Sequence, residues 1–193
     1  MRTWSYALVA VAVLCLSGCG YNSLQQKDEG VKAAWSEVVN QYQRRADLIP
    51  NLVNTVKGYA AQEQRVLVEV TEARAKVGSI QVTPEVLNNP ELFQKYQAAQ
   101  NQLTGALKSL FAVSENYPEL KANNNFMQLQ KRISELEEKI ADRREFFNDD
   151  VNTYNIRIQQ LPDVFLAGLM HLQHRDLFKV TDEDRQDVEV KIA

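Results

Sequence analysis

The chain has 193 residues, of which 45% are hydrophobic and 24% are charged, and its formal net charge is −3. This length favours a single domain, and this composition is typical of folded rather than disordered chains. Nucleic acid is excluded as a partner, because binding to a phosphate backbone requires a basic stripe that this acidic chain lacks.

The first 18 residues have the pattern of an export signal. Arg2 provides a positive start, residues 6–16 form an apolar core, and the small residues Ser17 and Gly18 precede Cys19. The core is too short to span a bilayer comfortably, since spanning takes about 20 residues. The small residues followed by a cysteine resemble the lipobox of bacterial lipoproteins. The alternative is an ordinary signal peptide, or an uncleaved anchor, with an incidental cysteine.

The lipobox resemblance implies that residues 1–18 are removed as a signal peptide and that residues 19–23 form a lipidated tether. Cys19 would carry acyl chains such as palmitate, and Cys15 would be discarded. The mature chain would then have no thiol for a disulfide, a nucleophile or a zinc site. We expect a lipid-anchored protein of the cell envelope. Gly20, in place of an Asp that would favour inner-membrane retention, points to the periplasmic face of the outer membrane where the organism has one.

The segment from Val31 to Val77 predicts a long amphipathic helix. Its seam, the set of positions that alternate in steps of four and three, comprises Val31, Trp35, Val38, Tyr42, Arg45, Ile49, Leu52, Val56, Tyr59, Glu63, Val66, Val70, Ala73 and Val77. This pattern indicates a helix packed at a shallow angle against its neighbours. Pro50 has no backbone N–H to donate to the Ala46 carbonyl, so the helix either kinks or ends there. The unbroken phase of the seam favours a kinked, nearly continuous helix.

Two more long helices follow a connection at residues 80–89. The first starts at Asn89 and Pro90, because Asn caps helices and Pro is tolerated in the first turn. The second runs from about residue 120 to Pro162, with a phase slip after Phe147 that brings Arg143 or Arg144 near the seam. We therefore expect an all-α fold at residues 24–173. It would be an elongated antiparallel bundle of three to four long helices, the first kinked at Pro50.

The C-terminal part of the chain has two distinct patterns. Residues 164–170 predict a short apolar helix that must be buried in the bundle, in a partner or in a membrane surface, with Phe165 and Leu166 as candidate contact residues. Residues 174–193 predict an acidic tail. Within it, residues 188–192 alternate between apolar and charged side chains, which suits a short strand, but no other strand is predicted to pair with it.

Arg44, Arg45 and Asp47, just before Pro50, form the most prominent polar cluster. Arg45 occupies a seam position, where an unpaired charge would be costly. One interpretation is an ion pair between Arg45 and Asp47 or Glu63 that fixes the register of the bundle. The other is a binding site for a partner or ligand at the kink.

Catalytic and metal-binding patterns are weak in this sequence. His171 and His174 have helical spacing, but no carboxylate or third ligand accompanies them, so we expect neither a metal nor another cofactor. Serines such as Ser114 lack the histidine or Gly-rich turn of a nucleophile. We therefore predict a protein that is not an enzyme.

The order of several motifs resembles the LemA family. These motifs lie at residues 21–24 (YNSL), 31–36 (VKAAWS), 44–53 (RRADLIPNLV), 56–59 (VKGY), 71–74 (TEAR) and 114–121 (SENYPELK). Similar pairs follow at residues 143–144 (RR), 147–148 (FN), 154–155 (YN) and 161–162 (LP). The resemblance covers about residues 21–172 and implies an elongated antiparallel helical bundle at the cell envelope. It does not imply a particular biochemical activity.

These patterns predict a non-catalytic cell-envelope lipoprotein that acts as a helical scaffold or adaptor. Its expected partners are the membrane, through the lipid anchor, and either an unidentified envelope protein or further copies of itself in a homo-oligomer. The alternative is a protein of the membrane surface that binds or remodels lipid, with residues 164–170 entering the bilayer. A hydrolase is the least favoured class.

Overall fold

The computed structural model describes the backbone of residues 2–179 and the side chains of residues 20–179. Over this range the predicted all-α class is confirmed, since every regular element is a helix. The elements are α1 (Arg2–Tyr59), α2 (Gln64–Gly78), the short 3₁₀ helix η1 (Pro84–Asn88), α3 (Pro90–Ser114), α4 (Pro118–Lys121), α5 (Asn124–Gln159) and α6 (Asp163–Leu169).

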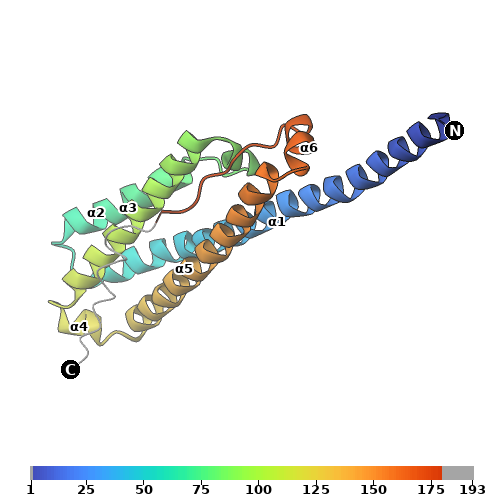
Figure 1. The fold of residues 1–193 in the computed structure, drawn as a ribbon. Coiled ribbons are helices and arrows are strands. Elements are labelled where there is room, and N and C mark those ends of the chain that lie inside the picture. The colour runs from blue at the N-terminus through green and yellow to red at the C-terminus, as the bar shows by residue number, and fades with distance from the viewer. Residues whose placement is uncertain (1, 180–193) are drawn as a thin grey trace, which may run out of the picture.

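The helices form two pairs that share one core. Helix α1 packs along α5, helix α2 packs along α3, and α1 also contacts α2. Successive long helices run in opposite directions, and the N-terminal part of α1 extends beyond the other helices (Figure 1). Helix α6 lies at that same end of the bundle, where it contacts both α1 and α5 (Figure 1).

The seam positions of α1 from Val31 to Val56 line the core as predicted, whereas Tyr59, the last seam position of this helix, is 41% exposed. Each of Val31, Trp35, Val38, Tyr42, Arg45, Ile49, Leu52 and Val56 is at most 2% exposed. Helix α5 likewise buries most of its heptad positions, namely Ile133, Ile140, Phe147, Val151, Tyr154 and Ile158, and leaves Leu129 and Leu136 partly exposed. The burial follows from the period of 3.5 residues, which keeps one face of each helix against its neighbour.

The prediction of one nearly continuous helix from Val31 to Val77 is wrong. Helix α1 ends at Tyr59, the chain turns, and α2 begins at Gln64. The turn is held by neighbours: the Tyr117 hydroxyl donates to the Glu63 carboxylate at 2.7 Å, and the Asn123 amide donates to the Tyr59 hydroxyl at 2.9 Å. Folding back allows both halves of the seam to share one core, which a straight helix would prevent.

Pro50 does not end the first helix. It lies inside α1, on the exposed side, and the helix continues to Tyr59. The Ala46 carbonyl, which Pro50 leaves without a donor, accepts a hydrogen bond from the Arg74 Nε of α2 at 3.0 Å. A side chain from the neighbouring helix therefore satisfies the acceptor that the missing N–H leaves free.

Candidate functional site

Arg45 lies at the centre of a buried polar layer that joins three helices. Its side chain is 0% exposed. Nη1 donates to the Glu137 carboxylate at 2.5 Å and to the Thr104 hydroxyl at 2.7 Å, and Nη2 donates to the Gln100 side-chain oxygen at 2.6 Å. Since Glu137 is on α5 and the other two acceptors are on α3, one guanidinium ties α1 to both helices.

The carboxylate partner of Arg45 is neither of the two residues named from the sequence. Asp47 is exposed and accepts a hydrogen bond from Gln43 at 2.7 Å, and Glu63 is held by Tyr117. Arg44 is also exposed, so the fold does not gather the predicted cluster into one site. Glu137 belongs to a charged stretch of α5, and nothing in the sequence distinguishes it from its acidic neighbours.

A cleft of about 350 Å³ opens beside this layer, between α3 and α5. Its walls are mostly apolar, and its lining residues are Tyr42, Gln100, Asn101, Thr104, Leu107, Lys108, Phe111, Ile133, Ser134, Glu137, Ile140, Ala141 and Arg144. The Tyr42 hydroxyl and the Gln100 amide nitrogen are buried without a hydrogen-bond partner among the described residues. Burial raises the pKa of the Tyr42 hydroxyl, so this group is a neutral donor at physiological pH.

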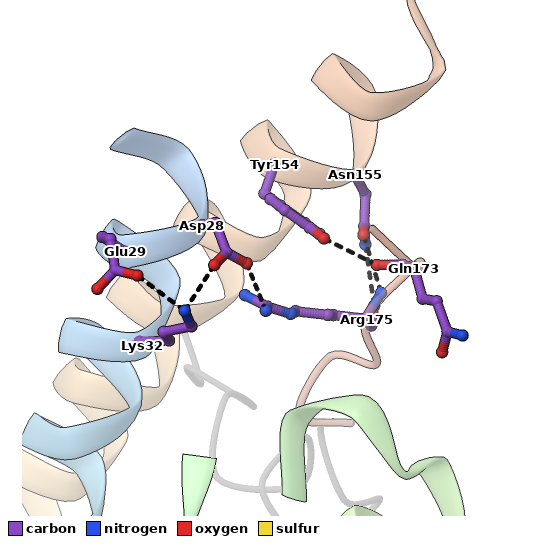
Figure 2. A network of polar contacts seen from close by, with 7 residues as sticks. All are labelled: Asp28, Glu29, Lys32, Tyr154, Asn155, Gln173 and Arg175. Carbon is purple, nitrogen blue, oxygen red and sulfur yellow. Dashed lines mark hydrogen bonds and ion pairs between the residues drawn. The ribbon is translucent and has the colours of Figure 1, made fainter. Parts of the chain in front are cut away.

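A second polar network lies near the N-terminal end of the bundle (Figure 2). The Arg175 guanidinium reaches Asp28 of α1 at 2.6 Å, and both side chains are less than one tenth exposed. Asp28 also pairs with Lys32 at 2.7 Å, and Lys32 pairs with Glu29 at 2.8 Å. These hydrogen bonds raise the pKa of the Lys32 ammonium. The Arg175 guanidinium also lies over the Tyr154 ring, with 4.6 Å between its central carbon and the ring centroid, so this charge contacts both a carboxylate and an aromatic face.

Residues 173–179, which we call the strap, lie in extended form against the bundle. Two asparagines of α5 hold the strap backbone in the same way. Asn155 accepts from the Arg175 N–H and donates to the Arg175 carbonyl, both at 2.9 Å, and Asn148 does the same for Phe178 at 2.8 and 3.0 Å. Residues 174–179, expected to begin the acidic tail, are therefore part of the packed structure.

Phe178 of the strap completes an aromatic cluster in the core. Its ring centroid lies 5.0 Å from Phe93 of α3, 5.3 Å from Phe147 of α5 and 6.1 Å from Trp35 of α1. At 4% exposure it is one of the core side chains. The short side-chain separations, across three helices and the strap, fix the path of the chain after α6.

The C-terminal helix predicted at residues 164–170 is present as α6, and it is buried on one side. Gly20 of α1 packs against it so closely that an added Cβ would lie 2.7 Å from Asp163 Oδ1 and 3.0 Å from Leu166 Cδ1. Asp163 is 2% exposed and pairs with Arg157 at 2.5 Å. Leu166 therefore lies against α1, whereas Phe165 is 74% exposed.

The part of α6 and its preceding turn that faces away from the bundle is apolar. Leu161 is 75% exposed, Phe165 is 74% exposed and Leu169 is 78% exposed, and we call these three residues the apolar end. Within the described part of the chain, no helix is both long and apolar enough for a membrane span. Within the same part, no group of three or more His, Cys, Asp and Glu side chains is arranged to hold a metal ion.

The fold and these contacts define an all-α helical-bundle protein whose core carries ion-paired arginines. The model of the LemA family matches residues 34–192, and the chain belongs to this family. It is 26% identical over 196 residues to magnetosome protein MamQ 1 of Paramagnetospirillum magneticum, with 90% of this chain and 72% of the relative covered. Magnetosome protein MamQ of Magnetospirillum gryphiswaldense is 25% identical, covering 82% and 64%. Protein LemA of Metamycoplasma hominis is 24% identical, covering 87% and 73%.

Proposed function

We propose that this protein is a non-catalytic, lipid-anchored scaffold of the cell envelope that presents a rigid helical bundle to a protein partner or to further copies of itself. One observation carries the proposal. Gly20, the residue directly after the cysteine expected to be acylated, packs against α6. Acyl chains on Cys19 would therefore hold the apolar end close to the membrane surface. The similarity to relatives named as magnetosome proteins supports an association with membranes.

The buried ion pairs suit a scaffold because they fix the relative positions of the helices. Arg45 joins α1 to α3 and α5, and Arg175 joins the strap to α1. Removing one partner of such a pair is strongly unfavourable, whereas the intact pair specifies one register. A bundle of fixed register presents the same surface to every partner.

The test is photo-crosslinking in intact cells. A photoreactive amino acid replaces Phe165 at the apolar end in one chain, and it replaces the exposed Glu135 in the first half of α5 in the control chain. The proposal expects crosslinks from position 165 to an envelope protein or to a second copy, and fewer from position 135. Capture of neither from position 165, in cells where the chain is acylated, would contradict the scaffold role.

The alternative function, direct binding or remodelling of lipid at the membrane surface, is favoured by the exposure of the apolar end. Three large apolar side chains are each about three quarters exposed there, namely Leu161, Phe165 and Leu169. Such a patch is typical of a protein or membrane contact. A soluble Cys19→Ser chain separates the two functions, because only the lipid-binding function predicts that it binds liposomes. A Phe165→Asp variant of the same chain is the control for specificity.

A further inference from the structure

A small groove lies between α1 and α5 at the end of the bundle where α6 packs, and we call it the end groove. Its volume is about 300 Å³, and its lining residues are Ser23, Lys27, Thr153, Ile156, Arg157 and Gln160. The two lining residues of α1 are one helical turn apart, and the four of α5 have the spacing of one helical face. The end groove is therefore formed by the packing of α1 along α5, which Figure 1 shows.

The charge of the end groove is positive. Two of its lining residues are cations, Lys27 and Arg157, and none of them is a carboxylate. Lys27 has no ion-pair partner among the residues whose side chains are described. In a chain of net charge −3, two cations on one groove without a lining carboxylate favour an anionic ligand.

Arg157 is held in place at the end groove by its neighbour. Its Nε lies 2.5 Å from the carboxylate of Asp163, which is 2% exposed, whereas the Arg157 side chain keeps 40% of its surface in solvent. Since a guanidinium has five N–H groups, an ion pair at Nε leaves the two terminal nitrogens as donors for a second anion. Two parallel N–H groups of this kind match the oxygens of a phosphate.

The other lining residues combine one amide with an apolar side chain. The Gln160 amide is exposed and is a further donor, whereas the Thr153 hydroxyl already donates to the Asp149 carbonyl at 2.9 Å. Ile156 is 49% exposed, and Gln160 directly precedes Leu161 of the apolar end. The groove therefore places cations and a polar donor beside exposed apolar surface, as the binding of an amphiphile with an anionic head requires.

The position of the end groove matches the headgroup layer of a membrane. Ser23 and Lys27 follow Cys19 by four and eight residues, so they lie about 6 and 12 Å further along α1 at ~1.5 Å per residue. The headgroup layer on each side of a bilayer is roughly 5–8 Å thick. Long cationic side chains just outside this layer can extend their charges into it. With Cys19 acylated, Lys27 would thus be within reach of lipid phosphates.

We propose that the end groove binds the phosphate group of a membrane phospholipid. The Lys27 ammonium and the terminal nitrogens of Arg157 bind the phosphate oxygens, and the acyl chains lie toward Ile156 and the apolar end. The inference rests on the proposed function, because it requires this end of the bundle to be held at a membrane. It adds a specific lipid site that fixes how the bundle is oriented on the membrane surface.

Native mass spectrometry of the full protein, purified in detergent, tests the proposal. Phosphatidylglycerol is added to one sample, diacylglycerol with the same acyl chains to a second, and inorganic phosphate alone to a third. We expect the protein to retain phosphatidylglycerol and to retain several-fold less diacylglycerol, which lacks the phosphate. Equal retention of the two lipids would overturn the proposal, because the acyl chains alone would then account for binding. Retention of inorganic phosphate as strong as that of phosphatidylglycerol would assign the groove to a free anion and would also contradict it.

A charge reversal in the end groove tests the site itself. Lys27→Glu should reduce the retained phosphatidylglycerol several-fold, because it places a like charge beside the phosphate. Lys57→Glu makes the same change at an exposed position near the other end of α1 and should leave retention unchanged. Lys27→Gln, which removes the charge without reversing it, should give a smaller loss. Equal retention by the Lys27→Glu and Lys57→Glu chains would contradict the site.

The same spectra separate this inference from the proposed function. The intact mass of each protein reports whether Cys19 carries acyl chains, and the adducts report whether the end groove binds phospholipid. An acylated chain that retains no phosphatidylglycerol would overturn the groove and leave the anchor in place. A chain without acyl groups that retains phosphatidylglycerol through Lys27 would support the groove and contradict the lipid anchor.

Discussion

Arg45 and Glu137 are 92 positions apart in the sequence, and their side chains meet at 2.5 Å in the interior of the bundle. Arg45 is fully buried, whereas the Glu137 side chain keeps 30% of its surface in solvent. This asymmetry determines how each residue responds to substitution. If the carboxylate is removed, the guanidinium remains buried without a counter-charge. If the guanidinium is removed, the carboxylate can still reach water.

We predict that Glu137→Ala lowers the free energy of unfolding by about 2–4 kcal/mol. The loss is somewhat below the ~3–5 kcal/mol for a fully buried pair, because water can partly replace the carboxylate. Urea denaturation followed by circular dichroism measures the change. The exposed neighbour Glu138→Ala is the matched control and should change stability by less than about 0.5 kcal/mol. Equal losses for the two variants would mean that the buried pair does not stabilise the bundle.

The sequence predicts the buried position of Arg45 but not its partner. Heptad spacing is a local property, so it places Trp35, Tyr42 and Arg45 on one face without knowledge of the rest of the fold. The partner depends on how α5 is rotated and shifted against α1. Glu137 lies among several acidic residues of α5, and only the three-dimensional register selects it.

The turn after Tyr59 illustrates the same limit. The seam keeps its phase from Val56 to Val66, so the period alone predicts a continuous helix. The turn is stabilised by Tyr117 and Asn123, which are distant in sequence. The sequence pattern likewise does not predict the strap, because Asn148 and Asn155 bind its backbone only after the chain has folded back past α6. Helix faces are therefore predictable here, and chain reversals fixed by distant side chains are not.

Phe178 should be essential to the stability of the bundle although it lies close to the C-terminus. Phe178→Ala removes one ring from a cluster of four and is expected to lower the free energy of unfolding by about 3–5 kcal/mol. Trp35, 6.1 Å away, should change its fluorescence in the folded variant. Phe146→Ala, at a side chain 59% exposed, is the control and should have a small effect. Unchanged stability in Phe178→Ala would show that the strap does not pack in solution.

Arg74 and Pro50 should be energetically coupled, because the hydrogen bond from Arg74 replaces the donor that Pro50 lacks. Arg74→Ala in the natural chain leaves the Ala46 carbonyl without its donor and should cost about 1–2 kcal/mol of unfolding free energy. In a Pro50→Ala background, the restored backbone N–H can reach that carbonyl, so the cost of Arg74→Ala should become smaller. A double-mutant cycle by chemical denaturation measures the difference. An identical cost in both backgrounds would contradict the coupling.

Stability should fall above about pH 10 because several tyrosines are buried. Burial raises the pKa of Tyr96 from 10.0 to about 12, and burial also raises the pKa of Tyr42 and Tyr154. Between these two pH values the unfolded chain loses tyrosine protons that the folded chain keeps, so the free energy of unfolding decreases as the pH rises. Below pH 10 both states are protonated, and this contribution is constant.

The Tyr96→Phe variant tests this assignment. The substitution removes one of the hydroxyls whose pKa is raised in the folded chain. The free energy of unfolding of this variant should therefore decline less steeply between about pH 10 and 12 than that of the natural chain. Denaturation midpoints measured across this range provide the slope. If the slopes are the same, Tyr96 titrates equally in the folded and unfolded states.

Gly20 packs against α6 so closely that no side chain larger than a hydrogen atom fits at this position. In Gly20→Ala the new methyl group would lie 2.7 Å from Asp163 Oδ1, and Asp163 cannot move freely because it is buried and paired with Arg157. Helix α6 must therefore shift away from α1. We expect a loss of about 1–3 kcal/mol in unfolding free energy, as for other overpacked sites. Hydrogen exchange in α6 should become faster than in the natural chain.

Gly30→Ala is the control on the same helix, and it should have the opposite sign. An added Cβ at Gly30 meets no atom within 4 Å. Alanine in a helix interior is more stable than glycine by about 0.5–1 kcal/mol, so Gly30→Ala should stabilise the bundle. Chemical denaturation of soluble Cys19→Ser chains carrying each substitution compares the two positions directly. If both substitutions stabilise, α6 does not pack against Gly20, and the apolar end loses its link to the acylated cysteine.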